Sequence, residues 1–174
     1  MIAHVFVDTN VFVYARDARD RAKQARAEDW IAQLWRDRSG RTSMQVLSEY
    51  YFSVTRKLVP RVASDEAWDD TRTLLAWEPH PVDAALLARA REIELRWRLS
   101  WWDSMVVSAA QLQGCALLLT EDLQDGAVYG GVTARSPFTL DMREPVPVYA
   151  AVPTIRPRHR ARGRPRKRQE PAAA

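Results

Sequence analysis

The chain has 174 residues, of which 47% are hydrophobic and 28% are charged. That length suits one domain with a sizeable core and is short for two. No apolar run approaches the roughly 18 residues of a membrane span, and no signal peptide precedes the first apolar run, so we expect a cytoplasmic protein with no membrane partner. The single cysteine, Cys115, precedes an apolar run and is predicted to be a small buried hydrophobe.

The formal net charge of +4 averages over two unlike parts of the chain. Eight basic residues lie between Arg156 and Arg168, which leaves 18 basic and 21 acidic residues in positions 1–155, a net charge of −3. The composition therefore predicts a folded domain over 1–145 and a disordered Arg/Pro-rich basic tail over 146–174. Attraction to nucleic acid is expected to be concentrated in the tail.

Predicted strands and helices alternate along the domain. β-branched and apolar runs predict strands at 4–7 and 115–119 and a short last strand at 132–134. Helical periodicity with start and stop residues predicts helices over 21–38, from Thr42 and Ser43 to Pro60, 64–77, 83–98 and 100–113, the first of them closed by Gly40. This alternation predicts an α/β fold with a central parallel sheet covered on both faces, whose ligand site lies beyond the C-terminal ends of the strands.

Four carboxylates stand out because of their positions. Asp8 and Asp122 end predicted buried strands, while Glu49 and Asp103 sit beside apolar helix faces with no basic residue one turn downstream. Carboxylates near a core are costly unless something neutralises them. A hard divalent cation suits oxygen ligands, and the sequence has no Cys or His cluster with zinc spacing.

Each of these residues also has a structural explanation. Asp8 can cap the helix that follows it, and Asp103 can form a capping box with Ser100. Glu49 can be a solvated residue on a helix flank, and Asp122 can serve a turn. Taken singly these explanations suffice, whereas the four positions together favour a shared site.

The motifs around these acids resemble a known family. They are Asp8-Thr9-Asn10-Val11, Ser48-Glu49-Tyr50, Trp102-Asp103-Ser104, and Thr120-Glu121-Asp122-Leu123-Gln124-Asp125-Gly126 followed by Ser136-Pro137-Phe138. In this order, over roughly residues 3–140, they resemble the PIN domain, and in particular the VapC-type toxins of bacterial toxin-antitoxin pairs.

The resemblance implies a three-layer α/β/α fold and an endoribonuclease that uses one or two Mg²⁺ or Mn²⁺ ions to hydrolyse RNA. It also implies a small antitoxin partner and a homodimer. Carried over by position, the catalytic metal ligands are Asp8, Glu49, Asp103 and Asp122, supported by Asn10, Thr120 and Asp125. The arginine-rich tail is not part of the family's usual pattern.

The tail contains a short segment that resembles an AT-hook, which reads narrow A·T tracts in the minor groove. Its residues are Arg162, Gly163, Arg164, Pro165, Arg166, Lys167 and Arg168. The simpler interpretation is a polycation that binds RNA or DNA without sequence choice. Either interpretation supports an alternative function, a non-catalytic nucleic-acid-binding protein that uses this tail.

Other candidate chemistries are weaker. Aspartyl phosphotransfer needs a second aspartate two residues after the first, where this chain has Asn10. His80 lies between two prolines and is interpreted as structural, while His159 belongs to the tail. The seven tryptophans have helical spacing, which favours core packing over stacking on bases.

Overall fold

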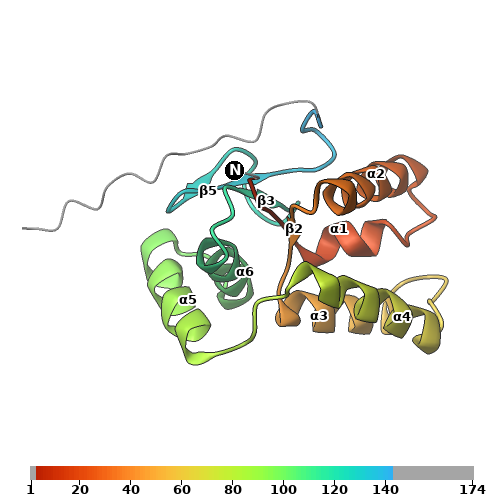
Figure 1. Cartoon of the computed structure of the whole chain (residues 1–174), viewed down its shortest axis with the longest axis horizontal. Helices are drawn as coiled ribbons and strands as arrows, with labels where there is room; N and C mark the ends of the chain where they lie inside the picture. The colour runs from red at the N-terminus through yellow and green to blue at the C-terminus, as the bar shows by residue number, and fades with distance from the viewer. Residues whose placement is uncertain (1–2, 143–174) are drawn as a thin grey trace, which may run out of the picture.

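A five-stranded sheet organises the computed structural model, which describes residues 3–142 (Figure 1). The strands lie in the order β2-β1-β3-β5-β4, and all neighbouring pairs are parallel except the antiparallel pair of β4 and β5. The strands are β1 (Val5–Val7), β2 (Gly40–Arg41), β3 (Leu117–Leu119), β4 (Val128–Tyr129) and β5 (Val132–Arg135). The predicted strands at 4–7, 115–119 and 132–134 are confirmed with slightly different ends.

The helices occupy the segments between these strands. They are α1 (Thr9–Tyr14), α2 (Arg21–Asp37), α3 (Met44–Arg56), α4 (Ser64–Leu74), the 3-10 turn η1 (Leu75–Trp77), α5 (Ala84–Trp97) and α6 (Trp101–Leu112). Side-chain caps begin all of the α-helices except α4. The caps are Asp8, Asp20, Ser43, Asp83 and Ser100, each of which accepts a hydrogen bond from a backbone amide in the first turn. The five predicted long helices are confirmed, and the fourth turn of the 64–77 segment is 3-10 rather than α.

Helices cover both faces of the sheet. Every residue of β1 and of β3 is buried, and successive side chains of a strand point to opposite faces, so neither face is open to water. Figure 1 shows α5 and α6 side by side, apart from the group formed by α1, α2, α3 and α4. The expected three-layer α/β/α arrangement is confirmed. None of the helices in the described part of the chain has both the length and the apolar character needed to cross a bilayer.

Two short strands, β2 and β4, were not predicted. β4 and β5 form a hairpin through Gly130 and Gly131, whose φ angles of 57° and 99° lie in the left-handed region that such two-residue turns require. β2 adds only two residues, beside β1. Gly40 lies in β2 and does not close the preceding helix. That helix, α2, ends at Asp37, and its C-cap is Arg38, whose backbone is in the left-handed conformation. The prediction for Gly40 was therefore wrong.

The absence of a side chain at Gly40 makes room for Trp77. A Cβ atom built at position 40 lies 2.7 Å from three atoms of the buried indole ring. Gly40→Ala should therefore lower the free energy of unfolding by about 1–3 kcal/mol through overpacking. Chemical denaturation measures this loss. In a Trp77→Leu background the same substitution should cost much less, and an equal cost in both backgrounds would contradict the explanation.

Candidate active site

The pairing of β1 with β3 sets the centre of the site. Val7 pairs with Leu119, so the residues that follow, Asp8 and Thr120, leave the sheet at the same edge. The amide of Asp8 donates to the carbonyl of Leu119 at 3.1 Å, and the Thr120 hydroxyl donates to Asp8 Oδ2 at 2.7 Å. Asp8 is also the N-cap of α1, where its Oδ1 accepts from the amide of Thr9. The capping explanation for Asp8 is therefore confirmed, and the same carboxylate also contacts Thr120 at this edge of the sheet.

Asn10 connects the acids at this edge. Its Nδ2 lies 3.3 Å from Asp8 Oδ2, 3.2 Å from Thr120 Oγ1 and 3.0 Å from Asp122 Oδ2. The amide of Asp122 in turn donates to Thr120 Oγ1 at 3.1 Å. Asn10 and Thr120 thus lie in contact with Asp8 and Asp122, and a neutral amide links the two carboxylates.

Glu49 approaches the cluster from α3. The hydroxyl of Thr9 donates to Glu49 Oε2 at 3.2 Å, which joins α3 to the start of α1. Gln45, one turn earlier on α3, donates to Glu49 Oε1 at 2.9 Å. Sequence reasoning missed both donors, although the i, i+4 spacing of Gln45 and Glu49 is a recognisable signal.

Asp103 makes different contacts. Its Oδ2 accepts from the hydroxyl of Ser100 at 2.7 Å and its amide donates back to Ser100 Oγ at 3.1 Å, which is the capping arrangement at the start of α6. The neighbouring charges that raise the pKa of Asp8 are those of Asp122 and Glu49, whereas the charge of Asp103 acts on Tyr129. The structure brings three of the four predicted acids together and shows no contact between Asp103 and the other three among residues 3–142.

Asp125 lies outside this cluster. Its Oδ1 accepts from Arg135 Nε at 3.1 Å and from the amide of Ser136 at 2.8 Å. The carboxylate therefore fixes the end of β5 rather than contacting the other predicted acids.

The Asp8 carboxyl has an unusual proton affinity. Burial raises its pKa from 3.8 to about 7, against the hydrogen bonds from Thr120 and Thr9, and the charges of Asp122 and Glu49 raise it further. In the part of the chain that the structure describes, no ion pair joins Asp8, Glu49 or Asp122 to a basic side chain. Within residues 3–142, no basic side chain therefore neutralises these three carboxylates by an ion pair.

The chemistry of the cluster suits a hard cation, although its geometry is not that of a closed metal site. The ligand atoms are carboxylate oxygens, and the buried Oδ1 of Asn10 has no hydrogen-bond partner within residues 3–142. Over the same range, no three carboxylate, imidazole or thiol groups lie close enough to hold a metal ion together. The amide of Asn10 now separates Asp8 from Asp122, where a cation would bring their oxygens together.

Lys23 bonds to the residue that precedes Asp122. Lys23 of α2 donates to Glu121 Oε1 at 2.7 Å and to the Tyr14 hydroxyl at 3.2 Å, and its ammonium lies 4.5 Å and 4.9 Å from the ring centroids of Tyr14 and Phe138. The hydrogen bond that Lys23 donates to Glu121 raises the pKa of Lys23. Two motifs distant in sequence, around residues 121 and 138, thus meet on one lysine that sequence reasoning did not single out.

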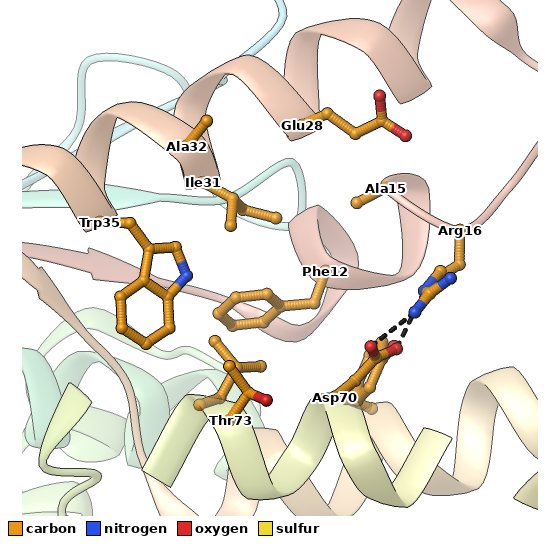
Figure 2. A pocket seen from close by; sticks show the side chains of 11 residues that line it. Phe12, Ala15, Arg16, Glu28, Ile31, Ala32, Trp35, Asp70 and Thr73 are labelled. Atoms are coloured by element: carbon orange, nitrogen blue, oxygen red, sulfur yellow. Dashed lines mark hydrogen bonds and ion pairs between the residues drawn. The ribbon is translucent and has the colours of Figure 1, made fainter. Parts of the chain in front are cut away.

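A separate pocket lies between α1, α2 and α4 (Figure 2). Its apolar lining includes Phe12, Ile31 and Trp35, and its volume is about 430 Å³. At its edge Arg16 donates through two nitrogens to Asp70, as the dashed lines in Figure 2 show. That contact raises the pKa of Arg16 above its ordinary value.

The remaining candidates are structural. The ring Nδ1 of His80 lies 2.9 Å from the carbonyl oxygen of the neighbouring Pro81. The backbone of His80 forms a β-bridge with Ser43. Cys115 is buried, and burial raises the pKa of its thiol to about 12, which excludes a thiolate at neutral pH. His159 and the AT-hook-like segment lie outside the described residues.

The tryptophans differ in their exposure to solvent. Trp30 and Trp77 are core residues, as the helical spacing predicted. Trp68 and Trp102 are 54% and 61% exposed, so core packing is the wrong interpretation for these two.

The shifted pKa of Asp8 predicts a dependence of stability on pH. The folded chain holds this proton more tightly than the unfolded chain, so the associated stability is complete below about pH 4 and is lost as pH rises through about 7. In EDTA, the wild type should lose about 3 kcal/mol more of its unfolding free energy between pH 5 and pH 8 than Asp8→Asn does. Urea denaturation at the two pH values measures this, and parallel losses would contradict the shift.

Comparison with known proteins assigns the chain to a family. The model of the PIN domain matches residues 5–125, well over half of the chain. A solved structure of Mycobacterium tuberculosis VapC20, described as a Sarcin-Ricin loop cleaving toxin, is similar with a TM-score of 0.49 and 20% identity, covering 66% of this chain and 86% of that chain. No curated protein matches the sequence. The matched range includes Asp8 and Asp122, which follow β1 and β3, and this chain belongs to the PIN-domain family.

Proposed function

We propose that this protein is a metal-dependent endoribonuclease that hydrolyses RNA phosphodiester bonds, as the toxin component of a type II toxin-antitoxin system. The observation that carries the proposal is the cluster of Asp8, Glu49 and Asp122, which has no basic partner within residues 3–142. Membership of the PIN-domain family supports the nuclease chemistry. The toxin role rests on the resemblance to VapC-type sequences.

Mg²⁺, or Mn²⁺ in its place, is the proposed cofactor, as one or two ions. Asp8 and Asp103 would be the direct ligands, with Glu49 and Asp122 binding through water or holding a second ion. The contacts of the structure support Asp8, Glu49 and Asp122, whereas Asp103 is included for its sequence motif. A bound ion would lower the pKa of an attacking water and stabilise charge on the scissile phosphate.

The chain's own residues would prepare the carboxylates for this role. Thr120 and the amide of Thr9 hold Asp8 in place, and Gln45 fixes the orientation of Glu49. Asn10 keeps Asp8 and Asp122 at one edge of the sheet. No nucleophilic side chain is required, and attack by water would leave a 5′ phosphate and a 3′ hydroxyl.

Partners follow from the same proposal. RNA is the substrate, and a small antitoxin would inhibit by inserting an Arg or Lys side chain among the carboxylates, where it would mimic a bound cation. A homodimer and a contact of the basic tail with DNA remain parts of the proposal that rest on sequence alone. Asn10 also bears on the phosphotransfer alternative, because its amide is engaged with two carboxylates and supplies no second acid.

Substitution of the acids tests the activity. Asp8→Asn and Asp103→Asn should each lower Mn²⁺-dependent cleavage of RNA by roughly 100-fold or more, because each removes charge where the transition state needs it and changes little volume. Asp65→Asn, which alters an exposed acid in the first turn of α4, is the matched control and should keep full activity. Cleavage is followed on gels with a labelled RNA.

Two outcomes would contradict the proposal. Undiminished cleavage by both variants would remove the catalytic assignment. Intact RNA after incubation of the wild type with Mn²⁺, together with retained binding, would favour the non-catalytic nucleic-acid-binding protein.

Metal binding has a readout besides activity. Millimolar Mn²⁺ should raise the Tm of the wild type, because a ligand bound only by the folded state stabilises it, by about 2.7 kcal/mol at 100 times its Kd. The Asp8→Asn, Asp103→Asn double variant should show no such rise in differential scanning calorimetry. An equal rise in the double variant would place the metal elsewhere.

A further inference from the structure

A groove with exposed aromatic walls adjoins the acidic cluster. It lies between α3 and the start of α6, has a volume of about 740 Å³, and is lined by Phe52, Trp102, Met105 and Val82 together with Glu49 and Lys57. We call it the aromatic groove. Trp102 is 61% exposed and Phe52 54% exposed, so two large ring faces are open to solvent in one place.

The aromatic groove adjoins a second groove that reaches the acidic cluster. The second groove is lined by Thr9, Asn10 and Asp122, and it shares Glu49, Ser53 and Lys57 with the aromatic groove. Because the same residues line both grooves, a ligand longer than one nucleotide that crosses them would contact Trp102 in one groove and Asp122 in the other.

Lys57 supplies a positive charge at the junction of the two grooves. Its side chain is exposed, and none of the ion pairs in the described part of the chain includes it. Its ammonium lies 5.4 Å from the ring centroid of Phe52. A cation beside an open aromatic face is the combination that holds a phosphate and its base in single-stranded nucleic acid.

Gln45 adds a polar group to the lining of the aromatic groove. It is 6% exposed, and its Nε2 donates to Glu49, which fixes the orientation of the amide because a carboxylate only accepts. Its Oε1 has no hydrogen-bond partner among residues 3–142. That oxygen is itself buried, so Gln45 contributes to the groove by holding Glu49 in place.

We propose that the aromatic groove binds an unpaired base of single-stranded RNA, which stacks on Trp102 or Phe52 while Lys57 contacts the adjoining phosphate. The assignment rests on the proposed function, since it gives the substrate a place beside the acidic cluster. Stacking on aromatic side chains suits RNA, whose recognised bases are splayed out of loops and single strands.

The lining of the groove favours RNA over a second copy of the chain. The cores of protein interfaces are depleted of charged residues. Here Glu49 and Lys57 lie in the lining itself, together with the buried amide of Gln45. A protein partner would have to cover these polar groups, whereas a nucleotide has a phosphate for the lysine.

The test measures the part of RNA affinity that depends on bases. Full-length protein in EDTA is titrated into a labelled single-stranded oligoribonucleotide and into the same oligonucleotide with abasic residues, and binding is followed by fluorescence anisotropy. The basic tail would contact phosphates and contribute equally to both affinities. The Kd for the abasic oligonucleotide divided by the Kd for the intact one therefore isolates stacking. EDTA prevents cleavage, so the measurement does not depend on catalysis.

Substitutions in the groove should lower this ratio. Trp102→Leu and Phe52→Leu keep apolar bulk but remove the ring, and at least one of them should reduce the preference for the intact oligonucleotide by roughly 5- to 150-fold. Trp102→Phe keeps a ring and should retain most of the preference. Trp68→Leu, which removes an equally exposed tryptophan on α4, is the control and should leave the ratio unchanged.

The opposite results would overturn the assignment. A ratio that is the same in the wild type, both leucine variants and the control would show that no base stacks in the groove. Conversion of a wild-type dimer to a monomer by Trp102→Leu in sedimentation, with the ratio unchanged, would identify the groove as a contact between two copies.

Cleavage in Mn²⁺ is measured in parallel to separate this assignment from the proposed function. A wild type that leaves RNA intact but keeps a ring-dependent preference for bases would end the nuclease proposal and leave the groove assignment standing. Cleavage of RNA by the wild type, together with a Kd ratio that the leucine substitutions do not change, would support the nuclease proposal and end the groove assignment.

Discussion

The parallel pairing of β1 with β3 is the constraint on which the acidic cluster depends. Each strand is only three residues long and buried on both faces, so its position is set by packing from two layers of helices. Because Val7 and Leu119 are partners, Asp8 and Thr120 must leave the sheet together. A slip of one residue would turn every side chain of the strand to the other face and would separate the two.

The cluster opposes the stability of the fold that builds it. Three carboxylates share a small region, and burial of Asp8 favours its uncharged form. Neutral donors from Asn10, Thr9 and Thr120 reduce the cost of this arrangement without removing the charge. A basic side chain would neutralise it better, but Lys23 is bonded to Glu121, and no ion pair within residues 3–142 includes Asp8, Glu49 or Asp122. The described part of the chain thus leaves these carboxylates without an ion pair, which is what a site for an added cation requires.

The sequence predicted the elements whose signals are local. Apolar runs ending in Asp8 and near Asp122 located β1 and β3, and capping residues with helical periodicity located the helices. It missed β2 and β4, which are two residues long, although the Gly130-Gly131 pair is a hairpin signal. Gly40 was misjudged because its role depends on Trp77, which is distant in sequence. Glu49 could be named from its motif, and its donor Gln45 lies one turn earlier on the same helix, but the contact with Thr9 depends on how α1 meets α3.

The exposure of Trp102 shows a further limit of helical spacing. Successive residues of a helix are about 100° apart, so the buried stretch from Ser104 to Ala110 means that α6 is covered on every side there. At the start of the same helix this cover ends: Trp101 is half-buried and Trp102 is exposed. Trp102 instead lines a groove that Glu49 also lines. A periodic pattern identifies which faces of a helix are apolar, whereas the placement of α3 decides whether an apolar side chain packs in the core or faces a ligand.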